Sequence, residues 1–265
     1  MKKVIHIQAL LILCCLISYG QTIIIEEVTE LPNPVYEASG LELGNEPNTF
    51  WSHNDKNNPT EIYQFDTAST LLKTIHINSG FSIVQSDFED LAKDNDNNLY
   101  IGDLGDNKLS RVLYRIYKIS TDSTDIDEVP TIEFFYPEFR SYDCESIFWL
   151  DGYIYLFIKN PRSPQGLVTQ SYRVPDQPGG YEAEFIENFI IPGAYPFPLT
   201  AADISPDGST IILMSKDEFY VLSCFTAPYF FTASAVLKVP FERIDESNRI
   251  PQTCLLYTSP SPRDS

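Results

Sequence analysis

Acidic and amide side chains cluster at the ends of short apolar segments in the middle of the chain. The most acidic stretch contains Glu89, Asp90, Asp103, Asp106 and Asn107. Carboxylate and amide oxygens are hard ligands of the kind that calcium takes in proteins. The sequence therefore predicts these five residues as candidate calcium ligands. The alternative is a structural role, because Asp and Asn at strand ends commonly cap turns.

Other polar residues occupy matching places before or after the apolar segments. Two antiparallel strands joined by a tight turn place the start of the first strand beside the end of the second. This geometry predicts Glu145 near Lys159, with a plain ion pair as the alternative, and Asp203 near Lys216. If the first strands line one axis, these groups gather at one mouth of a channel, where an anion bound through a metal would meet the cations. The candidate ligand-binding residues are His53, Asn54, Asp55, Glu89, Asp103, Glu145, Lys159 and Asp203.

Motifs of several common enzyme classes are absent from the sequence. It contains no G-x-S-x-G elbow for a nucleophilic serine, no H-E-x-x-H zinc motif and no glycine-rich phosphate loop. The acidic run that starts at Asp94 resembles a calcium loop, but Gly105 stands where an EF-hand has its closing glutamate. A hairpin turn is the better interpretation of that run. The sequence therefore leaves open whether the protein is an enzyme.

The candidate residues belong to a pattern of strand, turn and strand that recurs at a period of about 50 to 57 residues. Each copy has an acidic or small residue before an apolar one, then a turn, then an aromatic-rich strand with a polar end. The copies are SGLELGNEPNTFWSHND from Ser39, EDLAKDNDNNLYIGD from Glu89, ESIFWLDGYIYLFIK from Glu145 and ADISPDGSTIILMSK from Ala202. A period of this size is typical of propellers and repeat arrays.

Short runs of Val, Ile, Tyr, Phe and Thr alternate with Gly, Pro, Asn and Asp along the whole chain, which indicates strands and turns. The strands predicted for the four repeats are 38–43, 49–54, 61–66 and 71–77; 88–93, 99–103, 112–119 and 131–136; 144–150, 153–159, 168–174 and 183–191; and 200–205, 210–216, 219–223 and 233–239. A group of four strands per repeat is the blade of a β-propeller. We therefore expect an all-β propeller with about four blades present and an incomplete ring.

The two ends of the chain differ from its body. Residues 1–20 begin with Lys2 and Lys3, continue with an apolar stretch and end in small residues, which is the layout of a secretory signal peptide. A transmembrane anchor is the alternative, but the stretch is shorter than the roughly 20 residues that a spanning helix needs. The sequence thus predicts a secreted, periplasmic or cell-surface protein with no membrane span in the mature chain. Residues 254–265 include CLLYTSPSPRD, which looks like a translated sequencing adapter, so the propeller is expected within residues 21–253.

Charge and cysteine content narrow the choice of partners. The formal net charge is −19 at pH 7. This acidic excess repels a phosphate backbone, so nucleic acid is excluded as a favoured partner. Only Cys144 and Cys224 remain between residues 21 and 253. Two buried thiols are expected, with a single bridge as the alternative.

Several motifs together resemble a family of secreted bacterial β-propellers. They are EASGL with WSHND, DFEDLAKD with LYIGDLGDN, YDCESIF with YLFIKN, and LTAADISPDG. That family is related to the SdiA-regulated and phytase-esterase-like propeller groups and is frequent in the Bacteroidetes. The resemblance covers residues 35–253. It implies calcium-assisted hydrolysis of phosphate or carboxylic esters, with the matching Glu89, Asp103 and Glu145 as candidate residues.

Three functional hypotheses follow. The first is a secreted or cell-surface binding module whose ligand is a small molecule, a glycan or a surface protein. The second is a calcium-dependent esterase or phosphoesterase with its site at the channel mouth. The third is an adhesion or scaffold component.

Overall fold

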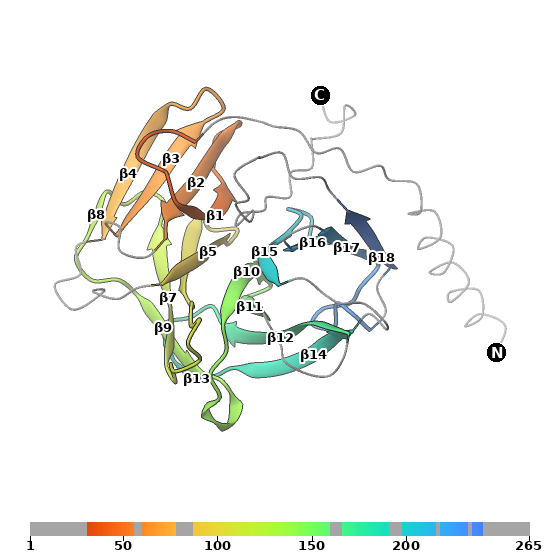
Figure 1. Ribbon diagram of the computed structural model, residues 1–265. Coiled ribbons are helices and arrows are strands. Elements are labelled where there is room, and N and C mark those ends of the chain that lie inside the picture. Colours follow the sequence, from red (N-terminus) through yellow and green to blue (C-terminus); the bar gives the residue numbers. More distant parts are fainter. Residues whose placement is uncertain are drawn as a thin grey trace, which may run out of the picture.

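The computed structural model describes residues 31–55, 60–77, 87–159, 166–190, 198–215, 218–232 and 235–240. These residues form four sheets that radiate from a common centre (Figure 1). The predicted signal peptide, the adapter-like segment and Lys216 lie outside the described residues.

Each sheet contains one blade of four antiparallel strands in chain order. Blade 1 has β1 (Ala38–Leu43), β2 (Thr49–Asn54), β3 (Glu61–Asp66) and β4 (Leu71–Ile77); blade 2 has β5 (Phe88–Lys93), β6 (Asn98–Asp103), β7 (Tyr114–Ser120) and β9 (Thr131–Phe135); blade 3 has β10 (Cys144–Leu150), β11 (Tyr153–Ile158), β12 (Leu167–Pro175) and β14 (Glu184–Ile190); blade 4 has β15 (Leu199–Ile204), β16 (Thr210–Ser215), β17 (Glu218–Ser223) and β18 (Ala235–Pro240). The prediction of an all-β propeller built from four-stranded blades is confirmed.

The first strand of each blade is the innermost. Strand β1 contacts β5, β5 contacts β10, and β10 contacts β15, so the four first strands follow one another around the centre (Figure 1). The adjacent blades cover these first strands on both faces. Most residues of β10 are accordingly buried. The outer strand β4 instead exposes Leu71, Leu72 and His76 to solvent. Whether the ring contains further blades stays a prediction.

Two short strands, which the sequence pattern did not predict, tie neighbouring blades together. Strand β8 (Asp125–Ile126) leaves blade 2 and pairs in parallel with β4 of blade 1. Strand β13 (Gly179–Glu182) leaves blade 3 and pairs in parallel with β9 of blade 2. Both come from the segment between the third and fourth strands of their blade, and both cover the outer edge of the preceding blade, which would otherwise be open to pairing.

The core lies between the blades rather than at the centre of one globule. Separate apolar clusters join blades 1 and 2, blades 2 and 3, and blades 3 and 4. Trp51 anchors the first of them and is 1% exposed. Cys144 and Cys224 are both free thiols; Cys144 is buried in the second cluster, as expected, whereas Cys224 is partly exposed, so the expectation of a buried thiol is wrong there.

A register shift near the start of every innermost strand fixes which side chains meet at the centre. The pairing of each first strand with the second skips residues after Ala38, Phe88, Cys144 and Leu199. A β-bulge of this kind redirects a side chain and is common at barrel rims and sites. The four equivalent bulge residues are Ser39, Glu89, Glu145 and Thr200.

Candidate functional site

One end of the central channel is formed where the first strands begin and the second strands end. Lys159 N–H donates to Asp143 O at 2.9 Å, and Leu104 N–H donates to Asp87 O at 3.1 Å. Asp55 N–H donates in the same way to the backbone oxygen of the residue before β1, at 2.8 Å. These repeated bonds place the residues before each bulge beside the residues after the second strand. We call the group at this end the acidic mouth; it consists of Asp55, Asp87, Glu89, Asp143, Glu145 and Lys159.

Five carboxylates of the acidic mouth form two overlapping groups around Glu89. In the first group, one oxygen each from Asp55, Asp87 and Glu89 lies within 4.8 Å of the others. In the second group, Glu89, Asp143 and Glu145 meet the same criterion. Glu89, Glu145 and Asp55, three of the predicted ligand-binding residues, thus lie at one mouth, and their role in binding stays a prediction.

Lys159 lies on the blade 3 side of the acidic mouth. Its ammonium donates a short hydrogen bond to Glu145 Oε1, and its Nζ lies 3.8 Å from Asp143 Oδ2. The side chain of Lys159 is 20% exposed, and that of Glu145 is 7% exposed. The predicted contact between Glu145 and Lys159 is thus present as a largely buried ion pair that extends to Asp143.

The electrostatics of the acidic mouth favour a positive charge. Burial and the neighbouring carboxylates, Glu145 foremost, raise the pKa of Glu89 to about 10, and Lys159 offsets this only in part. Burial raises the pKa of Glu145 to about 7 against the opposing effect of Lys159. For Lys159 itself, burial acts to lower the pKa, but Glu145 outweighs it and the pKa is raised. One lysine therefore does not neutralise the carboxylates gathered here.

Glycine and hydroxyl side chains complete the surroundings of Glu89. A Cβ atom at Gly105 would collide with Glu89 Oε1 and lie 2.5 Å from Asp87 Cγ, so only glycine leaves room for these two carboxylates. The bulge residues Ser39 and Thr200 are 2% and 5% exposed. Among the described residues, neither hydroxyl has a hydrogen-bond partner. Two hydroxyl oxygens at the level of Glu89 and Glu145 are thus buried without a partner in the described part of the chain.

Asp103 and Asn54, both predicted ligand-binding residues, occupy equivalent places on β6 and β2 and hold the backbone. Asn54 Oδ1 accepts from the backbone N–H of Glu37 at 3.0 Å, and Asp103 Oδ1 accepts from that of Asp87 at 3.0 Å. Asp103 Oδ1 also accepts from Arg111 at 2.9 Å. Through these contacts the two side chains hold the backbone of the residues that precede the innermost strands. This favours a structural role, rather than ligand binding, for both.

The other predicted calcium ligands do not join the acidic mouth. Asp90 is 1% exposed, and its two oxygens accept from the N–H groups of Leu91 and Ile147, each at 2.9 Å, so it links blade 2 to blade 3. Asp106 caps the following turn by accepting from Ser110 N–H and Arg111 N–H, each at 2.9 Å. Asn107 is exposed in that turn.

His53 is buried between blades 1 and 2 rather than open to the channel. Its ring lies edge-on to Phe88, with 5.6 Å between centroids, and Nδ1 lies 3.0 Å from Asn54 O. Burial lowers the pKa of His53 to about 4, so the ring is neutral at physiological pH. The expected contact of His53 with a bound anion has no support in this geometry.

Asp203 lies at the opposite end of the channel, which corrects the alignment of the fourth repeat. Because Thr200, not Ala202, occupies the bulge position of β15, Asp203 stands two places nearer the turn than that alignment put it. It lines a cavity with Glu42 and Lys93 and is absent from both carboxylate groups around Glu89. The expected neighbour Lys216 is outside the described residues.

Asp87 and Asp143 are members of the acidic mouth that the sequence reasoning did not select. Each stands two residues before a bulge residue, as Glu37 does in blade 1. An alignment of the repeats on Ser39, Glu89 and Glu145 would have shown an acidic residue at this place in three blades. That recurrence was the available signal.

Radial four-stranded antiparallel sheets around a channel with a polar mouth define the chain as a β-propeller. The chain belongs to the SdiA-regulated family, whose model matches residues 17–205. The described residues contain no helix with the length and hydropathy to cross a bilayer.

Solved structures with similar folds include the Dos1 propeller (TM-score 0.42, 10% identity, 77% of this chain and 48% of that chain). A functionally unknown protein from Desulfotomaculum acetoxidans DSM 771 is similar at TM-score 0.42 and 14% identity, over 77% of this chain and 56% of that chain. Raptor from Chaetomium thermophilum matches at TM-score 0.42 and 13% identity, over 85% of this chain and 18% of that chain. The chain thus spans about half or less of the length of these proteins. No curated protein matches it.

Proposed function

We propose that the protein is a binding module that works outside the cytoplasm and holds a calcium ion at its acidic mouth. The observation that carries the proposal is the convergence of Asp55, Asp87 and Glu89, with oxygens within 4.8 Å of one another, next to Asp143 and Glu145. The signal-peptide layout of residues 1–20 supports the location.

The donor set fits calcium in its chemistry. Calcium takes oxygen ligands from carboxylates, carbonyls and hydroxyl-bearing groups in flexible geometry. The group of Asp55, Asp87 and Glu89 is the better candidate of the two, because Lys159 already contacts Asp143 and Glu145. The room that Gly105 leaves for Glu89 and Asp87 favours the same place, as does the hydroxyl of Ser39, which has no hydrogen-bond partner among the described residues.

An ion at this mouth would supply the positive charge through which a ligand at the channel end is held. Its ligand is a small molecule, a glycan or a surface protein, bound where blades 1, 2 and 3 bring their polar residues together. Nucleic acid stays disfavoured because the chain carries a formal net charge of −19. Hydrolysis of an ester with Glu89, Asp103 and Glu145 is the alternative use of such an ion, but Asp103 Oδ1 already accepts from Asp87 N–H and from Arg111.

Calcium titration of the full chain tests the proposal. We expect the melting temperature in chelator-treated buffer to rise in a saturable way with calcium, because an ion that binds only the folded state adds about 2.7 kcal/mol at a hundredfold excess over Kd. Glu89→Gln should abolish the rise. The matched control Asp122→Asn, an exposed turn residue, should keep it.

The outcomes separate the functional classes. A melting temperature that calcium does not change in the wild-type chain would refute the calcium site. Chromogenic phosphate and acyl esters are then assayed with the calcium-loaded protein. Turnover that disappears in Glu89→Gln but not in Asp122→Asn would replace the binding module with the esterase alternative, whereas calcium binding without turnover supports the module.

A further inference from the structure

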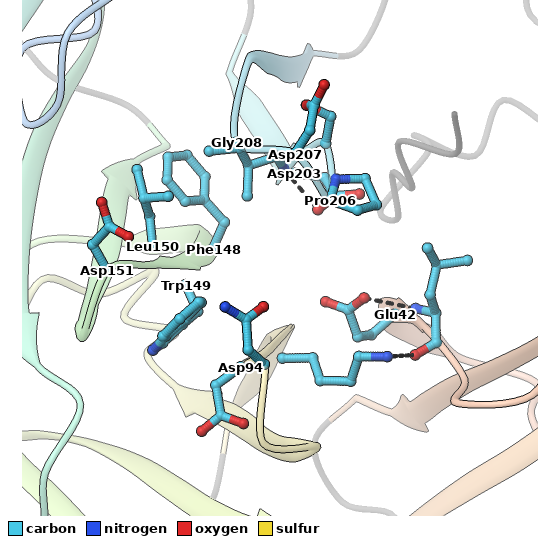
Figure 2. A pocket seen from close by; sticks show the side chains of 15 residues that line it. Glu42, Asp94, Phe148, Trp149, Leu150, Asp151, Asp203, Pro206, Asp207 and Gly208 are labelled. Carbon is cyan, nitrogen blue, oxygen red and sulfur yellow. Dashed lines mark hydrogen bonds between the residues drawn. The ribbon is translucent and has the colours of Figure 1, made fainter. Parts of the chain in front are cut away.

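A cavity of about 320 Å³ lies at the other end of the channel, where the first strands turn into the second. All four blades contribute to its lining, through Glu42, Lys93, Trp149 and Asp203 among others. We call it the turn-side cavity. Figure 2 shows Glu42 on one side of the opening, Phe148, Trp149 and Leu150 on the opposite side, and Asp203 and Asp207 along the edge between them.

The charge of the turn-side cavity is negative. Its lining contains one lysine, Lys93, and five carboxylates, which belong to Glu42, Asp94, Asp151, Asp203 and Asp207. Asp94 Oδ2 also lies 3.6 Å from Lys118 Nζ, outside the lining. Asp94 and Asp207 are turn caps: Asp94 Oδ1 accepts from Asn98 N–H at 2.8 Å, and Asp207 Oδ1 accepts from Ser209 N–H at 3.0 Å. Glu42 and Asp203 stand at equivalent places on the innermost strands β1 and β15 rather than in turns. Each also accepts one backbone hydrogen bond at 2.7 Å, Glu42 Oε1 from Leu43 N–H and Asp203 Oδ1 from Ile204 N–H.

Lys93 is directed to the wall of the cavity. Its ammonium donates to Leu43 O at 2.6 Å, so part of its hydrogen-bonding capacity is used by blade 1. Burial acts first to lower the pKa of Lys93, and Glu42 and Asp203 oppose that effect. A single lysine held against the wall leaves a net negative cavity.

The apolar side of the cavity is rigid. The indole Nε1–H of Trp149 donates to Asp176 Oδ2 at 2.7 Å, which fixes the ring. Phe148 is 2% exposed and packs against Phe230, with 5.5 Å between ring centroids. Aromatic faces attract cations as well as hydrocarbon.

We propose that the turn-side cavity binds an organic ammonium ion, with the ammonium between Glu42 and Asp203 and its hydrocarbon part against Phe148 and Trp149. A bare metal ion suits the place less well, because neither Glu42 nor Asp203 belongs to the acidic groups whose oxygens lie within 4.8 Å of one another in the described part of the chain. The acidic and aromatic halves of the cavity match the two halves of an alkyl ammonium ion. The proposal does not depend on the calcium site, which uses other residues.

Tryptophan fluorescence gives a direct readout, because the chain has two tryptophans. Trp51 is 1% exposed in the core between blades 1 and 2, whereas Trp149 lines the cavity. We expect titration of the full chain with n-butylamine, at constant ionic strength and neutral pH, to change the emission in a saturable way. Trp149→Phe should abolish the change, and calorimetry on that variant reports whether it still binds.

Charge-removing variants and neutral probes decide the outcome. Asp203→Asn and Glu42→Gln should each weaken butylamine binding about tenfold, the equivalent of one lost favourable charge contact. Asp122→Asn should leave binding unchanged. Equal binding of n-butanol, binding of methyl glucoside but not of butylamine, or no saturable change in a folded chain would each overturn the proposal. A melting temperature that does not respond to calcium in the same preparation would contradict the calcium site at the acidic mouth and would leave the amine site untouched.

Discussion

The two ends of the channel use the same four innermost strands and differ in what those strands bring together. At the acidic mouth, the bulge residues Glu89 and Glu145 and the residues beside the strand ends bring carboxylates of different blades within 4.8 Å of one another, next to a largely buried lysine. At the turn-side cavity, Glu42 and Asp203 lie in a space of about 320 Å³ that also has an aromatic wall. The position of an acidic residue along the innermost strand therefore matters more than its type. Near the start of the strand it lies close enough to other carboxylates to share a metal ion, and near the turn it lines a cavity that could hold a larger cation.

Removal of Lys159 should have the largest effect of the changes that test this comparison. Lys159→Met leaves Glu145 and Asp143 buried without their cation, and breaking a buried pair from one side costs about 3 to 5 kcal/mol. Urea denaturation in chelator-treated buffer measures the loss. Calcium should restore part of the stability, because it supplies positive charge to the same carboxylates.

A surface pair provides the control for Lys159. Arg115 and Glu133 lie 2.9 Å apart with side chains 38% and 46% exposed, and Arg115→Met should cost less than about 1 kcal/mol. Equal losses in the two variants would mean that the acidic mouth is no more strongly coupled than an exposed strand pair.

Glu89→Gln should stabilise the protein at neutral pH when calcium is absent. The folded-state pKa of Glu89 is raised to about 10 from an ordinary value of 4.5, so its contribution to stability is present below pH 4.5 and is lost as the pH rises toward 10. Glutamine keeps the uncharged form, and the free energy of unfolding at neutral pH should rise by about 1 to 3 kcal/mol. Denaturation curves between mildly acidic and mildly alkaline pH should show a gain that grows with pH. A loss of stability at neutral pH would show that the carboxylate is not crowded by its neighbours.

Variants of Asp103 test whether this residue only supports the backbone of the acidic mouth or binds the ion directly. Asp103→Asn keeps an acceptor for the N–H of Asp87 and loses only the charge opposite Arg111, whereas Asp103→Ala loses both interactions. We expect a destabilisation of about 1 kcal/mol for the asparagine variant and about 2 kcal/mol or more for the alanine variant. Because Asn54 performs the same task on β2, the calcium response should survive in Asp103→Asn. A calcium response that disappears in the asparagine variant would instead make Asp103 a ligand.

The repeat pattern was sufficient to predict the blades. Strand β1 and strand β10 begin and end where the apolar runs do, because the flanking Gly, Asn and Asp residues leave few other places for turns. Glu89 and Glu145 were matched correctly because both are the second residue of the first strand of their blade. The fourth repeat was aligned two residues late, because the bulge residue Thr200 carries no charge and Asp203 resembled the missing acidic residue.

The features that the sequence did not predict depend on contacts between blades. Strand β8 is two residues long, and β13 begins with two glycines, so neither has an apolar period; each forms because the edge of the preceding blade offers free backbone groups. Burial of His53 likewise follows from the packing of blade 2 on blade 1. The sequence of a single hairpin does not show which blade packs against it.

The smallest effect is expected at the turn-side cavity, where Glu42 should give a weak pH dependence. Burial raises the pKa of Glu42 to about 7, and Lys93 opposes this. The contribution of Glu42 to stability is therefore present below its ordinary pKa of 4.5 and is lost as the pH rises through about 7. The side chain is only half-buried, so solvent screens this effect. The free energy of unfolding of Glu42→Gln, relative to that of the wild type, should therefore rise by less than about 1 kcal/mol from acidic to alkaline pH. Urea denaturation at a series of pH values measures this difference, and saturating butylamine should reduce it, since an ammonium ion beside Glu42 favours the carboxylate. A difference that butylamine leaves unchanged would place the amine away from Glu42.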